Sequence, residues 1–151
     1  MTIAAVPNIG AQLWMAKHGQ ALVRVSELVS LKTPNPSHSI LDVTTHDSPA
    51  DAAGGVPMEK IKEVVYDPGQ ASGTINYVAG SANDDAWIEG RDGPDLYDFK
   101  FVVPTTGGAT EQMLCSGYIL AYEPQDKPVR GVQVANFTIE ITGVITQSAV
   151  A

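Results

Sequence analysis

The sequence has very little cysteine, few basic residues and no long apolar run. Cys115 is the single cysteine among 151 residues, which excludes an intrachain disulfide and a cysteine-based zinc site. Lysine and arginine number 9 against 17 aspartates and glutamates, for a formal net charge of -8. This balance argues against binding to nucleic acid or to an anionic membrane surface, because both require a clustered basic face. No stretch approaches the roughly 20 apolar residues that cross a bilayer.

The N-terminus also lacks the features of a secretory signal peptide. Residues 1–10 have neither a basic start nor a continuous apolar segment, so we expect the chain to be made and folded in a cytoplasm. Residues 1–9 show no apolar periodicity and contain Pro7. We therefore expect an arm that leaves the domain, and we expect the same of a tail at 146–151.

What is present indicates one globular, mainly β domain spanning 1–151. Hydrophobic residues make up 44% and charged residues 17% of the chain, which is ordinary for a folded domain of this length. The 14 glycines and 10 prolines are spread along the sequence, and this spacing favours many short strands separated by turns.

A long antiparallel hairpin is predicted in the middle of the chain. Its strands are expected at about 39–45 and 58–67, and a loop rich in glycine and alanine, residues 45–57, joins them. Pro34 and Pro36 before the hairpin, and Pro68-Gly69 after it, stop the neighbouring elements.

Further strands are expected on both sides of this hairpin. Residues 11–17 and 21–31 predict another hairpin, and strands are expected at 96–103, 110–123 and 131–145, with a turn at 105–108 between the first two of these. The last strand has the clearest alternation, because Phe137, Ile139 and Ile141 alternate with polar residues. Six to eight antiparallel strands fit two packed antiparallel sheets, as a β-sandwich or a partial barrel.

One short α-helix and one acidic loop complete the predicted fold. Within 70–80, Ala71, Ile75, Val78 and Ala79 recur at helical spacing. Residues 83–98 are rich in aspartate and glycine, which predicts a solvated loop. Such a loop could hold a hard cation, although it does not match the spacing of a calcium-binding loop.

Nothing in the sequence favours catalysis or a cofactor. His46, Asp47 and Ser48 are the residue types of a catalytic triad, but sequence neighbours rarely aim at one another in that way, and no Gly-x-Ser-x-Gly motif is present. The three histidines lie in separate turns without metal-ligand spacing. We expect no metal site, no cofactor and no enzyme activity.

Three segments, in their order and spacing, resemble one known family. They are the run Asp42-Val-Thr-Thr-His-Asp-Ser-Pro49, the strand exit Tyr66-Asp-Pro-Gly69 and the strand Ser116-Gly-Tyr-Ile-Leu-Ala-Tyr122. Together they resemble the major tail tube proteins of long-tailed, non-contractile, lambda-like bacteriophages, or of related gene-transfer particles. The resemblance covers nearly the whole chain. It also implies that the single helix lies at 70–80.

The resemblance implies a structural function in a virion tail. Such proteins form hexameric rings that stack into the tube through which DNA is ejected, and the tubes are assembled in the host cytoplasm. The implied partners are further copies of the chain and the tape measure, tail terminator and distal tail proteins. DNA would pass through without specific binding, and no membrane is involved.

Two sets of site residues are predicted on this basis. Residues His46, Asp47, Ser48, Pro49 and Asp51, in the loop 45–57, are expected to reach the adjacent ring. An acidic lumen is expected to be lined by the polar faces of the central hairpin and the last strand. The expected lumen residues are Asp42, Thr44, Glu59, Glu63 and Glu140. This set requires that the four hairpin residues share one face, and a one-residue slip in register would reverse the assignment.

Two other classes of function remain open from the sequence. One is a small β-sandwich binding module for carbohydrate or protein, and the other is an enzyme of unknown type. A binding module should stay monomeric at high concentration, whereas a tube subunit should form rings or tubes.

Overall fold

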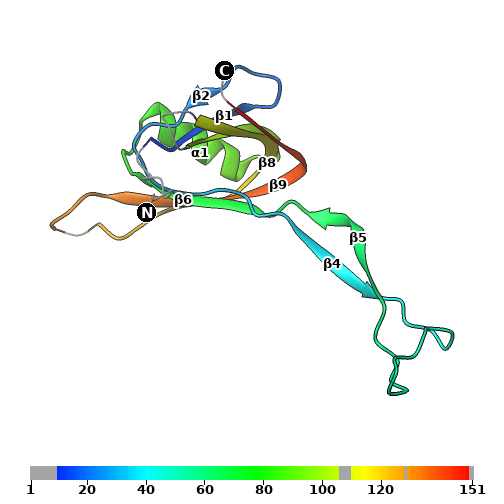
Figure 1. The fold of residues 1–151 in the computed structure, drawn as a ribbon. Helices are drawn as coiled ribbons and strands as arrows, with labels where there is room; N and C mark the ends of the chain where they lie inside the picture. The colour runs from blue at the N-terminus through cyan, green and yellow to red at the C-terminus, as the bar shows by residue number, and fades with distance from the viewer. Residues whose placement is uncertain (1–9, 106–109, 128, 150–151) are drawn as a thin grey trace, which may run out of the picture. The chain divides into compact units, whose positions relative to one another are not determined.

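The computed structural model describes residues 10–105, 110–127 and 129–149. The predicted arm 1–9, most of the predicted turn 105–108 and residues 150–151 lie outside these ranges. Contacts divide the chain into two compact units, one of Met1–Asn35 with Pro68–Ala151 and one of Pro36–Asp67. The elements in chain order are β1 (Gln12–Lys17), β2 (Val23–Arg24), β3 (Leu28–Lys32), β4 (Ser37–Asp42), β5 (Lys60–Asp67), β6 (Gln70–Asn76), α1 (Ala82–Asp92), β7 (Tyr97–Pro104), β8 (Thr110–Pro124) and β9 (Val134–Ala149) (Figure 1).

The larger unit is a single antiparallel sheet that curls until its two edges meet. Its strand order is β2-β1-β7-β8-β9-β6-β3, so the edge strands β2 and β3 are also consecutive in the chain. Only residues 25–27 separate them, and a connection of this length spans at most about 14 Å. The Val25 amide donates to the Leu13 carbonyl at 2.8 Å and the Asn76 amide to the Glu27 carbonyl at 3.0 Å. These bonds tie the connection to both sides of the curled sheet.

An aromatic core fills the space between the sheet and the helix α1. Alternate residues of the central strands are buried, among them Phe99 and Phe101 of β7 and Phe137 of β9, as expected for strands with one covered face. The fully buried Trp87 of α1 stacks on Phe137, with ring centroids 4.7 Å apart, and on Tyr122 at 6.0 Å. Such large buried aromatic side chains contribute much of a core's hydrophobic stabilisation.

The single helix lies one element later than predicted. Ser81 is its N-cap, and its hydroxyl accepts from the Asp84 amide at 3.2 Å. Asp84 and Asp85 in the first turn and Arg91 in the last turn match the helix dipole. The predicted acidic loop at 83–98 is therefore wrong over most of its length. The predicted helix at 70–80 is also wrong, because β6 pairs there with β3 and β9.

The mainly β fold with one helix is confirmed, and most strands lie where they were predicted. The predicted hairpin at 11–31 holds for β1 and β2, which pair antiparallel, whereas β3 crosses to the other edge of the sheet and pairs with β6. The strands β7, β8 and β9 match the three predicted strands. However, β9 continues into the predicted tail, where Thr146 pairs with Leu114 and Ala149 with Glu111.

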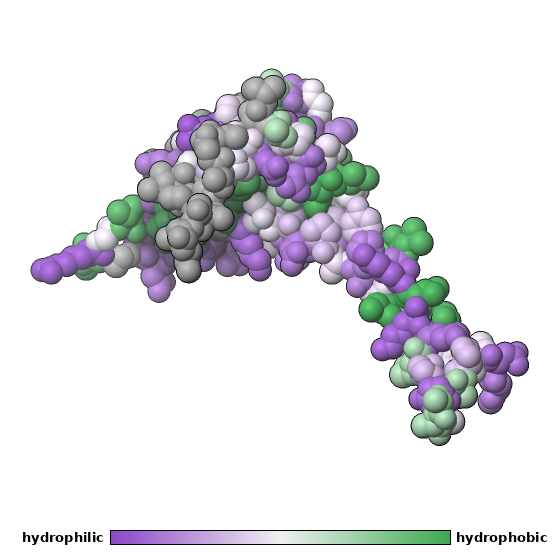
Figure 2. All heavy atoms as spheres, viewed as in Figure 1, coloured by the Kyte–Doolittle hydropathy of each residue, from purple (hydrophilic) through white to green (hydrophobic). Residues whose placement is uncertain are grey.

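The smaller unit is the predicted central hairpin, built from β4 and β5. Ser48 is the one buried residue that the structure describes within 36–67, so the hairpin has no hydrophobic core of its own. Figure 2 shows apolar side chains exposed along this unit. An isolated two-stranded hairpin is at best marginally stable in water, so burial by another chain would stabilise this one.

Candidate assembly surfaces

The hairpin has two faces that differ in charge. The pairs Asp42 with Lys60, Leu41 with Ile61 and Ile40 with Lys62 fix its register, and cross-strand partners share a face. Val43 joins Leu41 and Ile61, because the Val43 amide donates to the Glu59 carbonyl at 2.8 Å. We define the lysine face as Ile40, Asp42, Lys60 and Lys62, and the glutamate face as Leu41, Val43, Glu59, Ile61 and Glu63.

Both faces expose apolar side chains. On the lysine face Ile40 is 67% exposed, and on the glutamate face Ile61 is 52% exposed. Next to them in β5, Val64 is 90% and Val65 84% exposed. Soluble monomers rarely expose apolar side chains that lie so close together, and such surfaces usually mark an interface.

The predicted set of lumen residues does not share one surface. Asp42 lies on the lysine face, whereas Glu59 and Glu63 lie on the glutamate face. The cause is the parity of the register, since Asp42 pairs with Lys60 rather than with Glu59. The prediction that these hairpin carboxylates face the same way is therefore wrong. Thr44 follows β4, and its hydroxyl accepts from the Glu59 amide at 2.8 Å and donates to Asp42 at 2.7 Å.

The loop between the hairpin strands is built from two side-chain-stabilised turns. The Ser48 hydroxyl accepts from the Thr45 amide at 3.0 Å and donates to Glu59 at 3.2 Å, so Ser48 is not joined to His46 as a catalytic pair would be. Asp51 accepts from the amides of Ala53 and Gly55, both at 2.9 Å. His46, Asp47, Pro49 and Asp51 are exposed, and Ser48 is buried within the loop.

The polar face of β6 and β9 is a second extended surface, and it belongs to the larger unit. Gln70 pairs with Glu140 across the two strands, with Nε2 and Oε2 2.5 Å apart. The Thr74 hydroxyl donates to the Asn136 side chain at 2.8 Å. Hydroxyl and amide groups dominate this face, and Glu140 is its carboxylate. The polar face of the last strand predicted from sequence, with Glu140 opposite Phe137, is confirmed.

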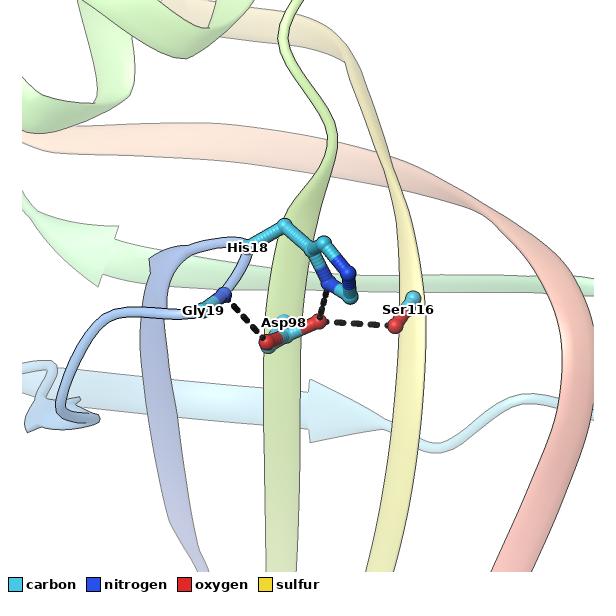
Figure 3. Close-up of polar contacts among 4 residues, drawn as sticks. All are labelled: His18, Gly19, Asp98 and Ser116. Atoms are coloured by element: carbon cyan, nitrogen blue, oxygen red, sulfur yellow. Dashed lines mark hydrogen bonds and ion pairs between the residues drawn. The ribbon is translucent and has the colours of Figure 1, made fainter.

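A His–Asp–Ser cluster in the larger unit was not predicted (Figure 3). Asp98 of β7 bonds to His18 Nδ1 at 2.8 Å, to the Ser116 hydroxyl at 2.7 Å and to the Gly19 amide at 3.2 Å. The serine donates to the same carboxylate oxygen that contacts the histidine, so His18 does not activate it as a triad base would. The cluster fastens the β1–β2 turn to the sheet.

The hydrogen bonds of this cluster lower the pKa of Asp98. Its partial burial favours the neutral acid, but the hydrogen bonds from His18, Ser116 and Gly19 outweigh burial and hold the pKa of the carboxyl below its ordinary value. By contrast, burial raises the pKa of the Cys115 thiol to about 12. This cysteine is therefore unsuited to act as a nucleophile at neutral pH.

The described residues meet neither the requirements of a metal site nor those of a membrane-spanning helix. No three His, Cys, Asp or Glu side chains of the described residues converge as a metal site would require. No helix among these residues is long and apolar enough to cross a bilayer.

Comparisons with known proteins give structural neighbours and no relatives by sequence. No family model matches the chain, and no curated protein matches it. A chain of the anti-feeding prophage baseplate has a TM-score of 0.75 at 6% identity, over 98% of this chain and 97% of that one. A chain of the sheath/tube terminator structure of the PVC extracellular contractile injection system has a TM-score of 0.67 at 10% identity, covering 99% and 100%.

The third neighbour is a tail tube itself. A chain of the SPP1 tail tube has a TM-score of 0.56 at 11% identity, over 95% of this chain and 80% of that one. The chain has a tail-tube-like fold. At these identities the likeness shows the fold alone. Because the neighbours include a contractile injection system, the fold does not separate contractile from non-contractile particles.

Proposed function

We propose that this protein is the structural subunit of a tail tube, whose copies form hexameric rings that stack into a conduit for DNA. The observation that carries the proposal is the hairpin 36–67, which exposes apolar side chains on both faces and has no core of its own. The tail-tube-like fold over nearly the whole chain supports it. A subunit that completes its burial only in an assembly accounts for this combination.

The chemistry of two surfaces, the loop 45–57 and the polar face of β6 and β9, supports a separate role for each. The loop 45–57 would contact the adjacent ring through His46, Asp47, Pro49 and Asp51, with Ser48 holding the loop in shape. The polar face of β6 and β9, with Glu140, would line the lumen. Hydroxyl and amide groups with a repeated carboxylate offer few strong sites to a phosphate backbone, which suits the passage of DNA. The protein would then belong to a virion tail assembled in the host cytoplasm, with tape measure, terminator and distal tail proteins as partners.

Assembly of the purified protein tests this proposal. Sedimentation and negative-stain microscopy over a range of concentrations should show rings or tubes with sixfold symmetry. A protein that remains monomeric at millimolar concentration would contradict the proposal and favour the binding module.

A further inference from the structure

The two faces of the hairpin carry opposite charge beside similar apolar side chains. Lys60 and Lys62 lie on the lysine face with Ile40, and Glu59 and Glu63 lie on the glutamate face with Ile61. No ion pair among the described residues joins Lys60 or Lys62 to a carboxylate within 4.0 Å. Both charges of the lysine face are therefore available to another chain.

The lysine face has a net positive charge although it also contains the Asp42 carboxylate. The Asp42 carboxylate accepts from both the amide and the hydroxyl of Thr44, at 2.9 and 2.7 Å, and these bonds hold its pKa below the ordinary value. Two ammonium groups against one carboxylate leave a net positive face. The glutamate face has two carboxylates and no cation within the described strands.

We propose that the lysine face of one hairpin packs on the glutamate face of the next copy around the ring. This inference rests on the proposed function and adds the surface, the direction and the charges of the contact between neighbouring subunits. A face-to-face contact of two sheets places them about 10 Å apart, a spacing that lysine and glutamate side chains span. The apolar residues at the centre of each face lose their exposure to water in this contact.

The contact joins two different surfaces, so it is head-to-tail and has a direction. Contacts of this kind generate closed rings when the rotation between copies closes, and open filaments when it does not. A contact between two identical faces would instead place lysine against lysine or glutamate against glutamate, which is repulsive. The charges thus select the head-to-tail arrangement against its alternatives.

Reciprocal charge reversal tests the proposal. In K60E/K62E both faces become acidic, and in E59K/E63K both become basic, so each variant alone should repel its own copies. We expect each to need at least a tenfold higher concentration than the parent to form rings, measured by mass photometry. An equimolar mixture of the two should assemble, because acidic and basic copies then alternate around a ring with an even number of subunits.

Two further proteins serve as controls. The quadruple variant, with all four substitutions, exchanges the charges of the two faces and should assemble like the parent, which also shows that the loss of the Ser48–Glu59 bond is tolerated. The variant K127E/R130E makes the same change in net charge as K60E/K62E, but in the larger unit, and it should assemble normally. Circular dichroism of each protein checks that it is folded.

The outcomes separate this inference from the proposed function. If the parent and both double variants form rings at the same concentration, the hairpin contact is wrong and the tube function stands. Folded double variants that fail alone and also fail as a mixture contradict the head-to-tail pairing. If the parent forms no rings under any condition, the proposed function fails and the inference fails with it.

Discussion

At the scale of single residues, Gly117 shows where the sheet admits no side chain. A Cβ at this position of β8 would lie 2.3 Å from the carbonyl oxygen of Glu140, a backbone atom that cannot move without distorting β9. We expect Gly117→Ala to lower the free energy of unfolding by about 1–3 kcal/mol, measured by urea denaturation.

Gly55→Ala is the matched control for this prediction. There the nearest atom to the added Cβ is an oxygen of the flexible Asp51 side chain, at 3.1 Å, so the change should stay within about 0.5 kcal/mol. Equal losses of stability in the two variants would mean that β8 and β9 adjust freely at Gly117.

Because of Asp98, we expect part of the stability of the protein to be lost at low pH. Its pKa is lowered in the folded protein, so its ionised form stabilises the fold above the ordinary carboxyl pKa, and this contribution is lost as the pH falls through the folded value. We expect the parent to have a higher Tm than Asp98→Asn at about pH 6, and the difference to shrink below about pH 4. A difference in Tm that stays constant down to about pH 2 would exclude this role.

The residues of this cluster also show a limit of sequence reasoning. His18 and Asp98 are 80 positions apart and Asp98 and Ser116 are 18 apart, and no local pattern connects them. They meet because β1, β7 and β8 are neighbours in the sheet, and the strand order is a property of the whole fold.

At the scale of elements, the amphipathic patterns located most strands, and local capping chemistry would have located the helix. In 70–80 the three- and four-residue spacing indicated a helix, but buried Ala71 and Ile75 also alternate in period two with Gly73 between them. The helix α1 has almost no apolar stripe, so periodicity missed it. Ser81 followed by Asp84 and Asp85 was the available signal, as an N-cap with an acidic first turn.

For the hairpin, the sequence predicted that the element exists but not which residues share a face. Two strands around a glycine-rich loop were sufficient to predict it. The faces were not predicted, because the alternation within each strand does not determine which face of β4 matches which face of β5. That depends on the pairing of Asp42 with Lys60 rather than with Glu59, and a one-residue difference in register reverses it.

A buried hydrogen bond anchors α1 to β8 and predicts a measurable loss of stability. The Tyr122 hydroxyl donates to the Asp84 carboxylate at 2.8 Å, and both side chains are buried. Burial and this carboxylate raise the pKa of Tyr122 well above its ordinary value. Tyr122→Phe leaves one oxygen of Asp84 without this donor, which should cost about 1–3 kcal/mol in urea denaturation.

Tyr118→Phe provides the comparison for that variant. Tyr118 lies in the same strand but is 42% exposed, and water replaces any partner of its hydroxyl. We expect no change beyond about 0.5 kcal/mol. A Tyr122→Phe variant as stable as Tyr118→Phe would show that α1 does not depend on the buried bond.

At the scale of the whole molecule, the fold class was predictable and the closure of the sheet was not. Alternating strands indicated two packed sheets or a partial barrel, and both satisfy the same pattern. The short connection of three residues between β2 and β3 brings the two edges of one sheet together, so the structure is a single curled sheet. The sequence shows this short connection, but it does not show that β2 and β3 lie at opposite edges of the sheet.

If the loop between β4 and β5 joins adjacent rings, a variant with a shortened loop should form rings but no long tubes. Replacing residues 50–55 by two glycines removes the Asp51 turn but keeps Ser48 and its bonds to Thr45 and Glu59. If the loop contacts the adjacent ring, this variant should form single rings or short stacks, counted by negative-stain microscopy. Tubes of normal length would remove the loop from the contact between rings.

The proposed lumen leads to a test on DNA itself. Glu140 lies on the polar face of β6 and β9 beside Gln70, and stacked rings would repeat its carboxylate along the tube. In Glu140→Lys tubes the repeated cations should retain DNA in about 50 mM salt and release it at several hundred millimolar, as counterion release requires. Glu140→Gln removes the charge without adding a cation, so its tubes should retain no DNA.

A comparison of linear with circular DNA tests whether Glu140 faces the lumen. Because only a molecule with free ends can enter a tube, the Glu140→Lys tubes should retain linear DNA and leave covalently closed circular DNA in solution. Equal retention of both forms would place Glu140 on the outer wall, since a circle reaches the outside of a tube as easily as a linear molecule does.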